Sequence, residues 1–157
     1  MNKNIIVKAF FETFPEFKID QKTIVQLILI ANQTRKTAYT PYSHYNVGVA
    51  LLSKSGKIYH GCNIENVSYT PTIHAEQAAI IEAVVNGETT KDRKFIKTLV
   101  VVHGGNSMPC GLCRQVIQEF CDNAVIINAD LNGKILNIKL LSELLPNAFT
   151  PSYLGIK

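Results

Sequence analysis

Apolar side chains recur at helical spacing in three long segments of the chain. Residues 20–36 form a mostly apolar run of helical length, and Asp20 stands where an N-cap is expected. Residues 73–86 repeat apolar positions at intervals of three and four before an Asn-Gly pair, which is typical of a helix end. Residues 111–121 show the same spacing. The pattern therefore predicts three helices, followed by a helical turn at 142–145.

Shorter apolar runs between these segments predict strands. Residues 47–52 and 57–61 flank a Ser-Lys-Ser-Gly turn and indicate a hairpin. Residues 96–102 and 124–129 are mostly apolar runs, typical of strands buried on both faces, and 134–138 forms a short further strand. The order of elements predicts an α/β fold, a three-layer α/β/α sandwich built on a five-stranded mixed sheet.

Composition narrows the class of protein without identifying it. The 157 residues predict a single domain spanning 1–157, and 46% apolar against 18% charged residues argues against disorder. A net charge of +4 is too weak to indicate nucleic-acid binding. No segment reaches the roughly 20 apolar residues of a membrane span, and no signal peptide is visible, so we expect a cytoplasmic protein. Spaced cysteines in that reducing compartment more often indicate metal binding or catalysis than disulfides.

Two short motifs carry metal-binding chemistry. His74-Ala-Glu76 and Pro109-Cys110-Gly-Leu-Cys113 each open a predicted helix. Catalytic zinc takes three protein ligands and leaves a fourth position for water, and one His with two Cys supplies that number. The thiols lie three residues apart, so they can face the same side of the first helical turn. The positive end of the helix dipole also favours the thiolate form that binds metal.

Each motif alone is weak evidence, and the conjunction is strong. Cys-x-x-Cys could equally be a redox dithiol or two buried thiols, and His-x-Glu most often marks a solvated helix start. Together, His-x-Glu followed by Pro-Cys-x-x-Cys is the signature of zinc-dependent nucleobase deaminases. In that setting Glu76 can take a proton from water beside the metal and return it to the substrate.

The chain resembles the cytidine deaminase family over about residues 24–149. Four blocks carry the resemblance, and residues 1–20 lie outside it with no functional interpretation. The blocks are AYTPYSHYNVGVALL at 38–52, GCNIENVSY at 61–69, MPCGLCRQVIQEF at 108–120 and LLPNAF at 144–149. The resemblance implies the cytidine deaminase-like form of the α/β/α fold.

The resemblance also implies roles for individual residues. Asn63 and Glu65 match the family's ribose-binding pair. Tyr45 stands where the family usually has Phe, lining the base and the sugar, and its additional hydroxyl needs a hydrogen-bonding partner. Tyr69 and Phe149 match positions that reach a neighbouring subunit's site in the short tetrameric members.

The metal motif departs from the short-chain pattern. Short members commonly have Cys at the position of His74 and Arg at that of Gln77, whereas His-Ala-Glu-Gln resembles the long dimeric members. Two thiolates with a neutral His balance Zn²⁺, so no compensating Arg is needed. Because the chain has no room for the second domain of the long form, we expect a homotetramer.

The resemblance implies a hydrolase that holds one Zn²⁺ per subunit. His74, Cys110 and Cys113 are its expected ligands, and Glu76 is the expected catalytic residue. The implied reaction is the deamination of cytidine and deoxycytidine to uridine and deoxyuridine with release of ammonia, a step of pyrimidine salvage. The expected partner is a small pyrimidine nucleoside, with neither nucleic acid nor membrane.

Two alternatives stay open at this level. One is a related deaminase with another substrate, such as deoxycytidylate, a tRNA base or an antibiotic nucleoside. The other is a structural zinc module with a closed fourth ligand, for which Cys62 is a candidate. Cys62 and Cys121 are otherwise expected to be reduced thiols. The remaining histidines, His44, His60 and His103, have no partner pattern and are expected on the surface or in strands.

Overall fold

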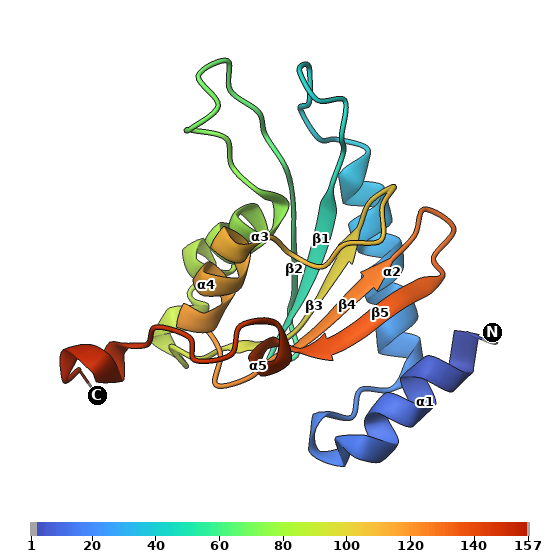
Figure 1. The fold of residues 1–157 in the computed structure, drawn as a ribbon, viewed down its shortest axis with the longest axis vertical. Helices are drawn as coiled ribbons and strands as arrows, with labels where there is room; N and C mark the ends of the chain where they lie inside the picture. The colour runs from blue at the N-terminus through green and yellow to red at the C-terminus, as the bar shows by residue number, and fades with distance from the viewer. Residues whose placement is uncertain (1–2, 157) are drawn as a thin grey trace.

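The computed structural model describes residues 3–156 and is built around one sheet (Figure 1). Its five strands lie in the order β2-β1-β3-β4-β5. Strands β3 and β4 are parallel, and the other neighbours are antiparallel, which confirms the predicted mixed sheet. The strands are β1 (Gly48–Ser53), β2 (Ile58–Cys62), β3 (Ile96–Val102), β4 (Val125–Ala129) and β5 (Ile135–Leu140).

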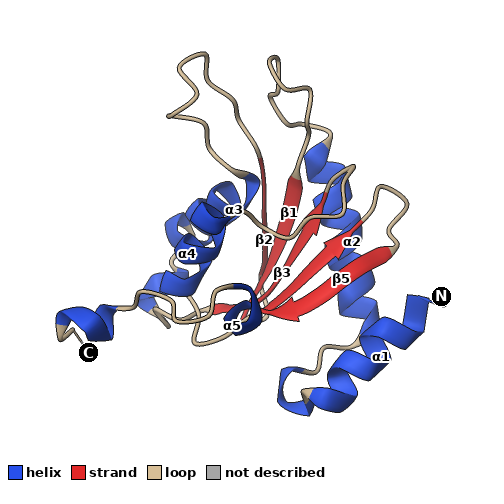
Figure 2. Ribbon diagram, viewed as in Figure 1, coloured by secondary structure: helices blue, strands red, loops and turns tan. Residues whose placement is uncertain are grey.

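Helices cover both faces of the sheet and complete the three layers (Figure 2). Helices α1 (Lys3–Thr13) and α2 (Gln21–Arg35) lie on one face, and α3 (Ala75–Val85) and α4 (Gly111–Glu119) lie on the other. The four-residue α5 (Leu141–Leu144) follows β5 directly. None of the helices within residues 3–156 is long and apolar enough to cross a membrane.

Strand β1 shows how the alternation of side chains divides the core. Ala50 and Leu52 face the layer of α1 and α2, whereas Val49 and Leu51 face α3 and α4. All four are buried, because a central strand covered on both faces has no solvent side. The mostly apolar sequences of β1, β3 and β4 follow from this burial.

Helix α1 was not predicted from the sequence. Its apolar residues pack on the same core as α2, and Phe10 is buried there among Ile6, Val7 and Phe11. The helix also contacts β5 at the edge of the sheet. The predicted start of α2 is confirmed, because the Asp20 carboxylate accepts a hydrogen bond from Thr23 N–H at 2.9 Å.

One end of the sheet gathers the segments that carry the sequence motifs. The first residue of β1, Gly48, pairs with the last residues of β2 and β3, Cys62 and Val102. The loop before β1 and the loop between β2 and α3 project beyond this end of the sheet (Figure 1). The loop between β3 and α4 lies at the same end (Figure 1). At Gly61 a Cβ would lie 2.4 Å from the backbone nitrogen of Ala79, so glycine there permits the close packing of α3 on β2.

Candidate metal centre and nucleoside cavity

His74 is the N-cap of α3 and is held by its backbone. Its extended conformation (φ −78°, ψ 154°) places it just before the first helical residue. The Gln77 side-chain carbonyl accepts a hydrogen bond from the His74 N–H at 2.9 Å. This contact satisfies a polar group of the chain entering the helix and leaves the imidazole ring available as a ligand.

The two motif cysteines lie in the first turn of α4. Cys110 is its N-cap and Cys113 its third residue. The loop before them is fixed by Arg114, which donates from Nε to the Pro109 carbonyl at 2.6 Å and from Nη1 to the Leu144 carbonyl at 2.9 Å. One guanidinium therefore joins the metal loop to the C-terminal part of the chain.

His74, Cys110 and Cys113 come together as the sequence predicts. The His74 Nδ1 atom lies 3.5 Å from Cys110 Sγ and 3.3 Å from Cys113 Sγ, and all three atoms lie within 4.8 Å of one another. Tetrahedral zinc with N and S ligands at about 2.1 and 2.3 Å needs ligand atoms about 3.5–3.8 Å apart. The donor set and its spacing fit a zinc ion.

The electrostatics of the group also fit a cation. Burial raises the pKa of the Cys113 thiol, and the adjacent Glu76 carboxylate raises it further. A thiolate buried beside a carboxylate requires a positive charge in contact with it. Zn²⁺ bound to the sulfur meets that requirement, because a coordinating thiol is deprotonated outright.

Glu76 is buried in the first turn of α3, next to the metal ligands. Its side chain is 5% exposed and lines the same cavity as His74 and Cys110. Within residues 3–156 its side-chain interaction is with the Cys113 thiol. Glu76 lies at the N-terminal end of α3 and forms part of the cavity wall.

A cavity of about 350 Å³ opens beside this group. It is lined by residues of the loops at 43–47 and 63–74, of the start of α3, of the end of β3 and of the loop at 103–110. Two of the predicted substrate-binding residues, Tyr45 and Asn63, line it. Among the described residues that line it there is no Lys or Arg.

Asn63 and Glu65 shape the mouth of the cavity through the backbone. Asn63 donates from Nδ2 to the Tyr45 carbonyl at 2.9 Å and accepts from the Val47 N–H at 2.8 Å. Glu65 accepts from the Ser43 hydroxyl and from two backbone N–H groups of the 42–43 turn. The Ser43 hydroxyl, helped by those N–H groups, lowers the pKa of Glu65. Glu65 does not itself line the cavity, whereas Ser43 does.

Tyr69 and Phe149 lie outside the cavity of their own chain. Their side chains are 75% and 59% exposed. The Phe149 carbonyl accepts a hydrogen bond from Gln115 Nε2 at 2.8 Å, which ties the C-terminal segment to α4. The two aromatic rings are therefore presented to solvent in the isolated chain.

The two other cysteines are free thiols and do not join the metal group. Cys62 lines a separate cavity beside α2 and the edge strand β2, where the Thr37 hydroxyl donates to its sulfur at 3.5 Å. Cys121 is buried, and burial raises its pKa to about 12. The structure thus gives no support to Cys62 as a fourth ligand of a closed site.

The sequence interpretation missed His103. It was expected on the surface or in a strand without partners, but it follows β3 directly, is 3% exposed and lines the cavity. His44 and His60 are exposed as expected. The position of His103 in the sequence could have indicated its place in the cavity. A residue that directly follows a buried central strand lies at the end of the sheet where the loops of an α/β fold form the binding crevice.

Comparison with known proteins identifies the relatives of this chain. The model of the cytidine and deoxycytidylate deaminase zinc-binding region matches residues 21–129. A cytidine deaminase of Sporosarcina psychrophila is 44% identical over 130 residues, which cover 81% of this chain and 91% of that protein. The chain belongs to the cytidine deaminase family. Because it spans nearly the whole of that relative, it is a short-chain member.

Solved structures of family members share the fold. The cytidine deaminase of Burkholderia pseudomallei superimposes with a TM-score of 0.73 at 33% identity, covering 83% of this chain and all of that one. The cytidine deaminase of Mycobacterium tuberculosis gives 0.70 at 35% identity, covering 85% and 99% of the two chains. The family match begins at residue 21, so residues 1–20 lie outside it, as the resemblance in sequence implied, and α1 falls within this segment.

Proposed function

We propose that this chain is a zinc-dependent hydrolase that deaminates cytidine and deoxycytidine to uridine and deoxyuridine with release of ammonia. The observation that carries the proposal is the His74, Cys110 and Cys113 group beside the buried Glu76 at one cavity. Three ligands leave a fourth coordination position, which is typical of catalytic rather than structural zinc. Family membership supports the same reaction.

His74, Cys110 and Cys113 would hold the metal. Zinc in such a site supplies Lewis acidity that makes water a nucleophile at neutral pH. Glu76 takes the proton of the attacking water, delivers a proton to N3 of the base, and later passes one to the departing amine. Its burial beside the metal ligands and its place in the cavity lining suit both roles, because a general acid–base must lie within reach of the reacting atoms.

The cavity favours a nucleoside over a nucleotide. A phosphate group is normally bound by Arg, Lys or backbone N–H groups, and no Lys or Arg is among the described residues lining the cavity. Tyr45 supplies an aromatic wall for base and sugar, and Asn63 and Glu65 supply polar groups for the ribose hydroxyls. Glu65 would have to exchange a hydrogen bond from the 42–43 turn for one from the sugar.

We further propose that the chain, as one domain, assembles into a cytoplasmic homotetramer. The exposed Tyr69 and Phe149 would then reach a neighbouring subunit's cavity. Light scattering should give a mass about four times that of the 17.4 kDa chain. Phe149→Ala should then raise the KM for cytidine, and a monomeric active enzyme would contradict the assembly. The thiolates of the metal site suit a reducing compartment.

The test of the reaction is an absorbance assay of cytidine loss with parallel measurement of ammonia. We expect turnover that a strong chelator abolishes and added zinc restores. A panel of cytidine, deoxycytidine, deoxycytidylate and adenosine should show turnover of the first two. Turnover of deoxycytidylate alone would replace the proposed substrate, and a zinc-loaded chain without any turnover would favour the structural module.

A further inference from the structure

We propose that His103 is a positioning residue for the nucleoside, acting through Tyr45; this rests on the proposed function. The Tyr45 hydroxyl lies 2.6 Å from His103 Nδ1, and both side chains line the cavity. The rings are 5.6 Å apart between centroids. The extra hydroxyl of Tyr45 therefore has its partner in a buried histidine at the end of β3.

The neighbours of His103 fix the hydrogen on its ring. The backbone N–H of Gly105 donates to Nδ1 at 2.9 Å, and a backbone N–H can only donate, so Nδ1 carries no hydrogen. The Ser107 carbonyl lies 2.9 Å from Nε2 and can only accept, so Nε2 carries the hydrogen. The Tyr45 hydroxyl consequently donates to Nδ1, with its oxygen lone pairs left for other partners.

The surrounding packing leaves little freedom to this pair. A Cβ on Gly105 would lie 2.8 Å from the Tyr45 hydroxyl oxygen and 3.2 Å from His103 Nδ1. The Asn128 amide nitrogen on the neighbouring strand β4 lies 3.2 Å from Nε2, and its buried oxygen has no partner within residues 3–156. A hydrogen on Nε2 is compatible with this amide once its oxygen and nitrogen are interchanged, because the oxygen then accepts from Nε2. His103 thus connects the loop that leads to Cys110 with the aromatic wall contributed by Tyr45.

The consequence is a fixed wall for the bound nucleoside. An exposed tyrosine without a partner would sample several side-chain orientations, and binding would have to restrict them. Tyr45 is 45% exposed, so packing alone does not hold it. The bond to Nδ1 supplies the missing restraint, and its loss should weaken nucleoside binding without affecting the chemical step.

Two substitutions separate this role from a structural one. In His103→Asn the side-chain oxygen takes the position of Nδ1, so it can accept from Tyr45 and Gly105 while the bond to Ser107 is lost. In His103→Gln the amide nitrogen takes the position of Nε2, so the bond to Ser107 is kept and the acceptor for Tyr45 is lost. The variants are compared by KM and kcat for cytidine, by zinc content and by uridine affinity from calorimetry.

We expect His103→Gln to raise the KM for cytidine and weaken uridine binding about fivefold, the effect of losing one hydrogen bond. His103→Asn should stay within about twofold of wild type, because the bond to Tyr45 is retained. Both should keep kcat and zinc content. Tyr45→Phe should weaken binding as much as His103→Gln, and the double variant should be no worse than either, which is the mark of a shared interaction.

The opposite order of the two His103 variants would overturn the inference, because it would show that the Ser107 bond is the important one. Additive effects of the Tyr45 and His103 substitutions would overturn it as well. Cytidine turnover by the wild-type chain reads out the proposed function separately. Uridine affinity does not depend on turnover, so the two claims can fail independently.

Discussion

Two buried glutamates lie at opposite ends of one helix and have different surroundings. Glu76 lies in the first turn of α3 and is 5% exposed, whereas Glu88 lies just beyond the end of α3, in the turn Glu88–Thr90, and is 1% exposed. Burial alone does not distinguish them. The difference lies in what the carboxylate oxygens contact.

Glu88 is surrounded by donors. It accepts hydrogen bonds from Ser53 at 2.7 Å, Tyr59 at 2.8 Å and Ser55 at 2.9 Å, and Lys91 lies at 3.3 Å. Burial opposes its ionisation, but these donors outweigh that cost and lower the pKa of Glu88 to about 2. Glu76, by contrast, contacts the Cys113 thiol and faces a cavity.

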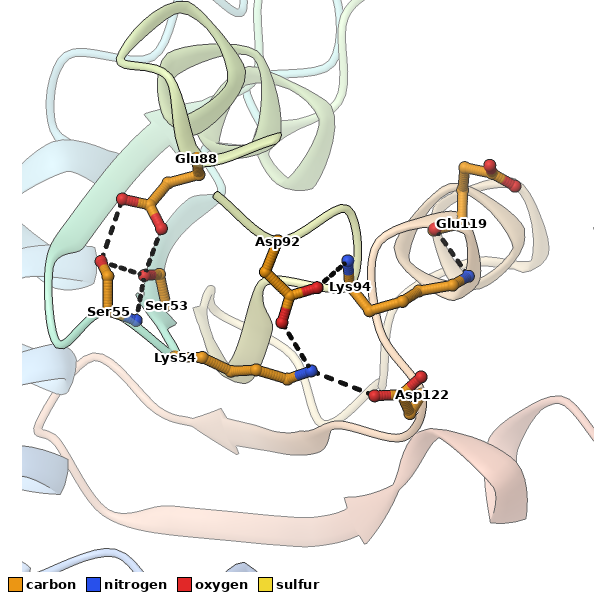
Figure 3. Close-up of polar contacts among 8 residues, drawn as sticks. All are labelled: Ser53, Lys54, Ser55, Glu88, Asp92, Lys94, Glu119 and Asp122. Atoms are coloured by element: carbon orange, nitrogen blue, oxygen red, sulfur yellow. Dashed lines mark hydrogen bonds and ion pairs between the residues drawn. The ribbon is translucent and has the colours of Figure 1, made fainter. Parts of the chain in front are cut away.

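The surroundings of Glu88 extend this pattern of satisfied polar groups (Figure 3). Lys54 lies 3.0 Å from both Asp92 and Asp122, joining the β1–β2 turn to the segments before β3 and β4. Lys94 donates to the Glu119 carbonyl at 2.8 Å, at the end of α4. At this end of the sheet the polar groups are therefore paired with one another, whereas at the other end Glu76 and His74 line the cavity.

The largest expected effect comes from a substitution in the metal site. Cys110→Ala removes one of three zinc ligands, so metal analysis should find zinc lost and cytidine turnover should vanish. Cys62→Ala is the matched control, since Cys62 is a free thiol outside the metal group and should leave both unchanged. Full zinc occupancy in Cys110→Ala would show that the ligand assignment is wrong.

Substitutions around Glu88, at the other end of α3, should lower stability and leave catalysis unchanged. Glu88→Gln keeps one neutral acceptor oxygen and turns an amide NH₂ donor toward the donors of the other oxygen. We therefore expect a loss of about 2 kcal/mol in the free energy of unfolding, with kcat unchanged. Urea titration measures the loss. Asp122→Asn, which disrupts an exposed ion pair in the same region, should cost less than about 1 kcal/mol. Equal losses in the two variants would contradict the distinction.

The same comparison predicts a pH dependence of stability. The pKa of Glu88 is lowered from 4.5 to about 2 in the folded chain, so its contribution is present above about pH 5 and is lost as the pH falls toward 2. The difference between wild type and Glu88→Gln should therefore shrink on acidification. A difference that is constant between pH 7 and 3 would rule out this assignment.

A smaller effect is expected at Gln77, which supports the metal ligand without contacting the metal. Gln77→Arg removes the acceptor for the His74 N–H and adds positive charge beside a ligand set that already balances Zn²⁺. We expect zinc affinity to fall about fivefold, the cost of one lost capping contact. Gln77→Glu keeps the acceptor and should bind zinc as well as wild type. Unchanged zinc affinity in both variants would show that Gln77 does not support the metal ligand His74.

The fold and the metal group could be predicted from local pattern. Apolar periodicity gave the strands and the main helices, because burial on one or both faces imposes it. Helix α1 was not predicted, because its apolar residues match no motif. Its contact with β5 and with the core beside α2 becomes visible only in the folded structure. His74, Cys110 and Cys113 were predictable because each motif stands at a helix start.

Contacts between segments far apart in the chain could not be predicted from the sequence. The pairing of Tyr45 with His103 joins residues 58 positions apart, and nothing in either segment signals the other. Glu65 matched a ribose-binding position, yet in the structure its oxygens hold the 42–43 turn. The same limit hid the contrast between Glu76 and Glu88, because hydrogen-bond saturation is a property of the folded surroundings.

The most direct test of the account is the kcat for cytidine of zinc-loaded Glu76→Gln and Glu88→Gln, measured side by side with their zinc content. Removal of a general acid–base typically costs about 10²–10⁴ in rate. We expect Glu76→Gln to lose at least about 10³ in kcat while retaining zinc, and Glu88→Gln to keep wild-type kcat. Wild-type turnover by Glu76→Gln, or an equal loss in both variants, would contradict the central claim.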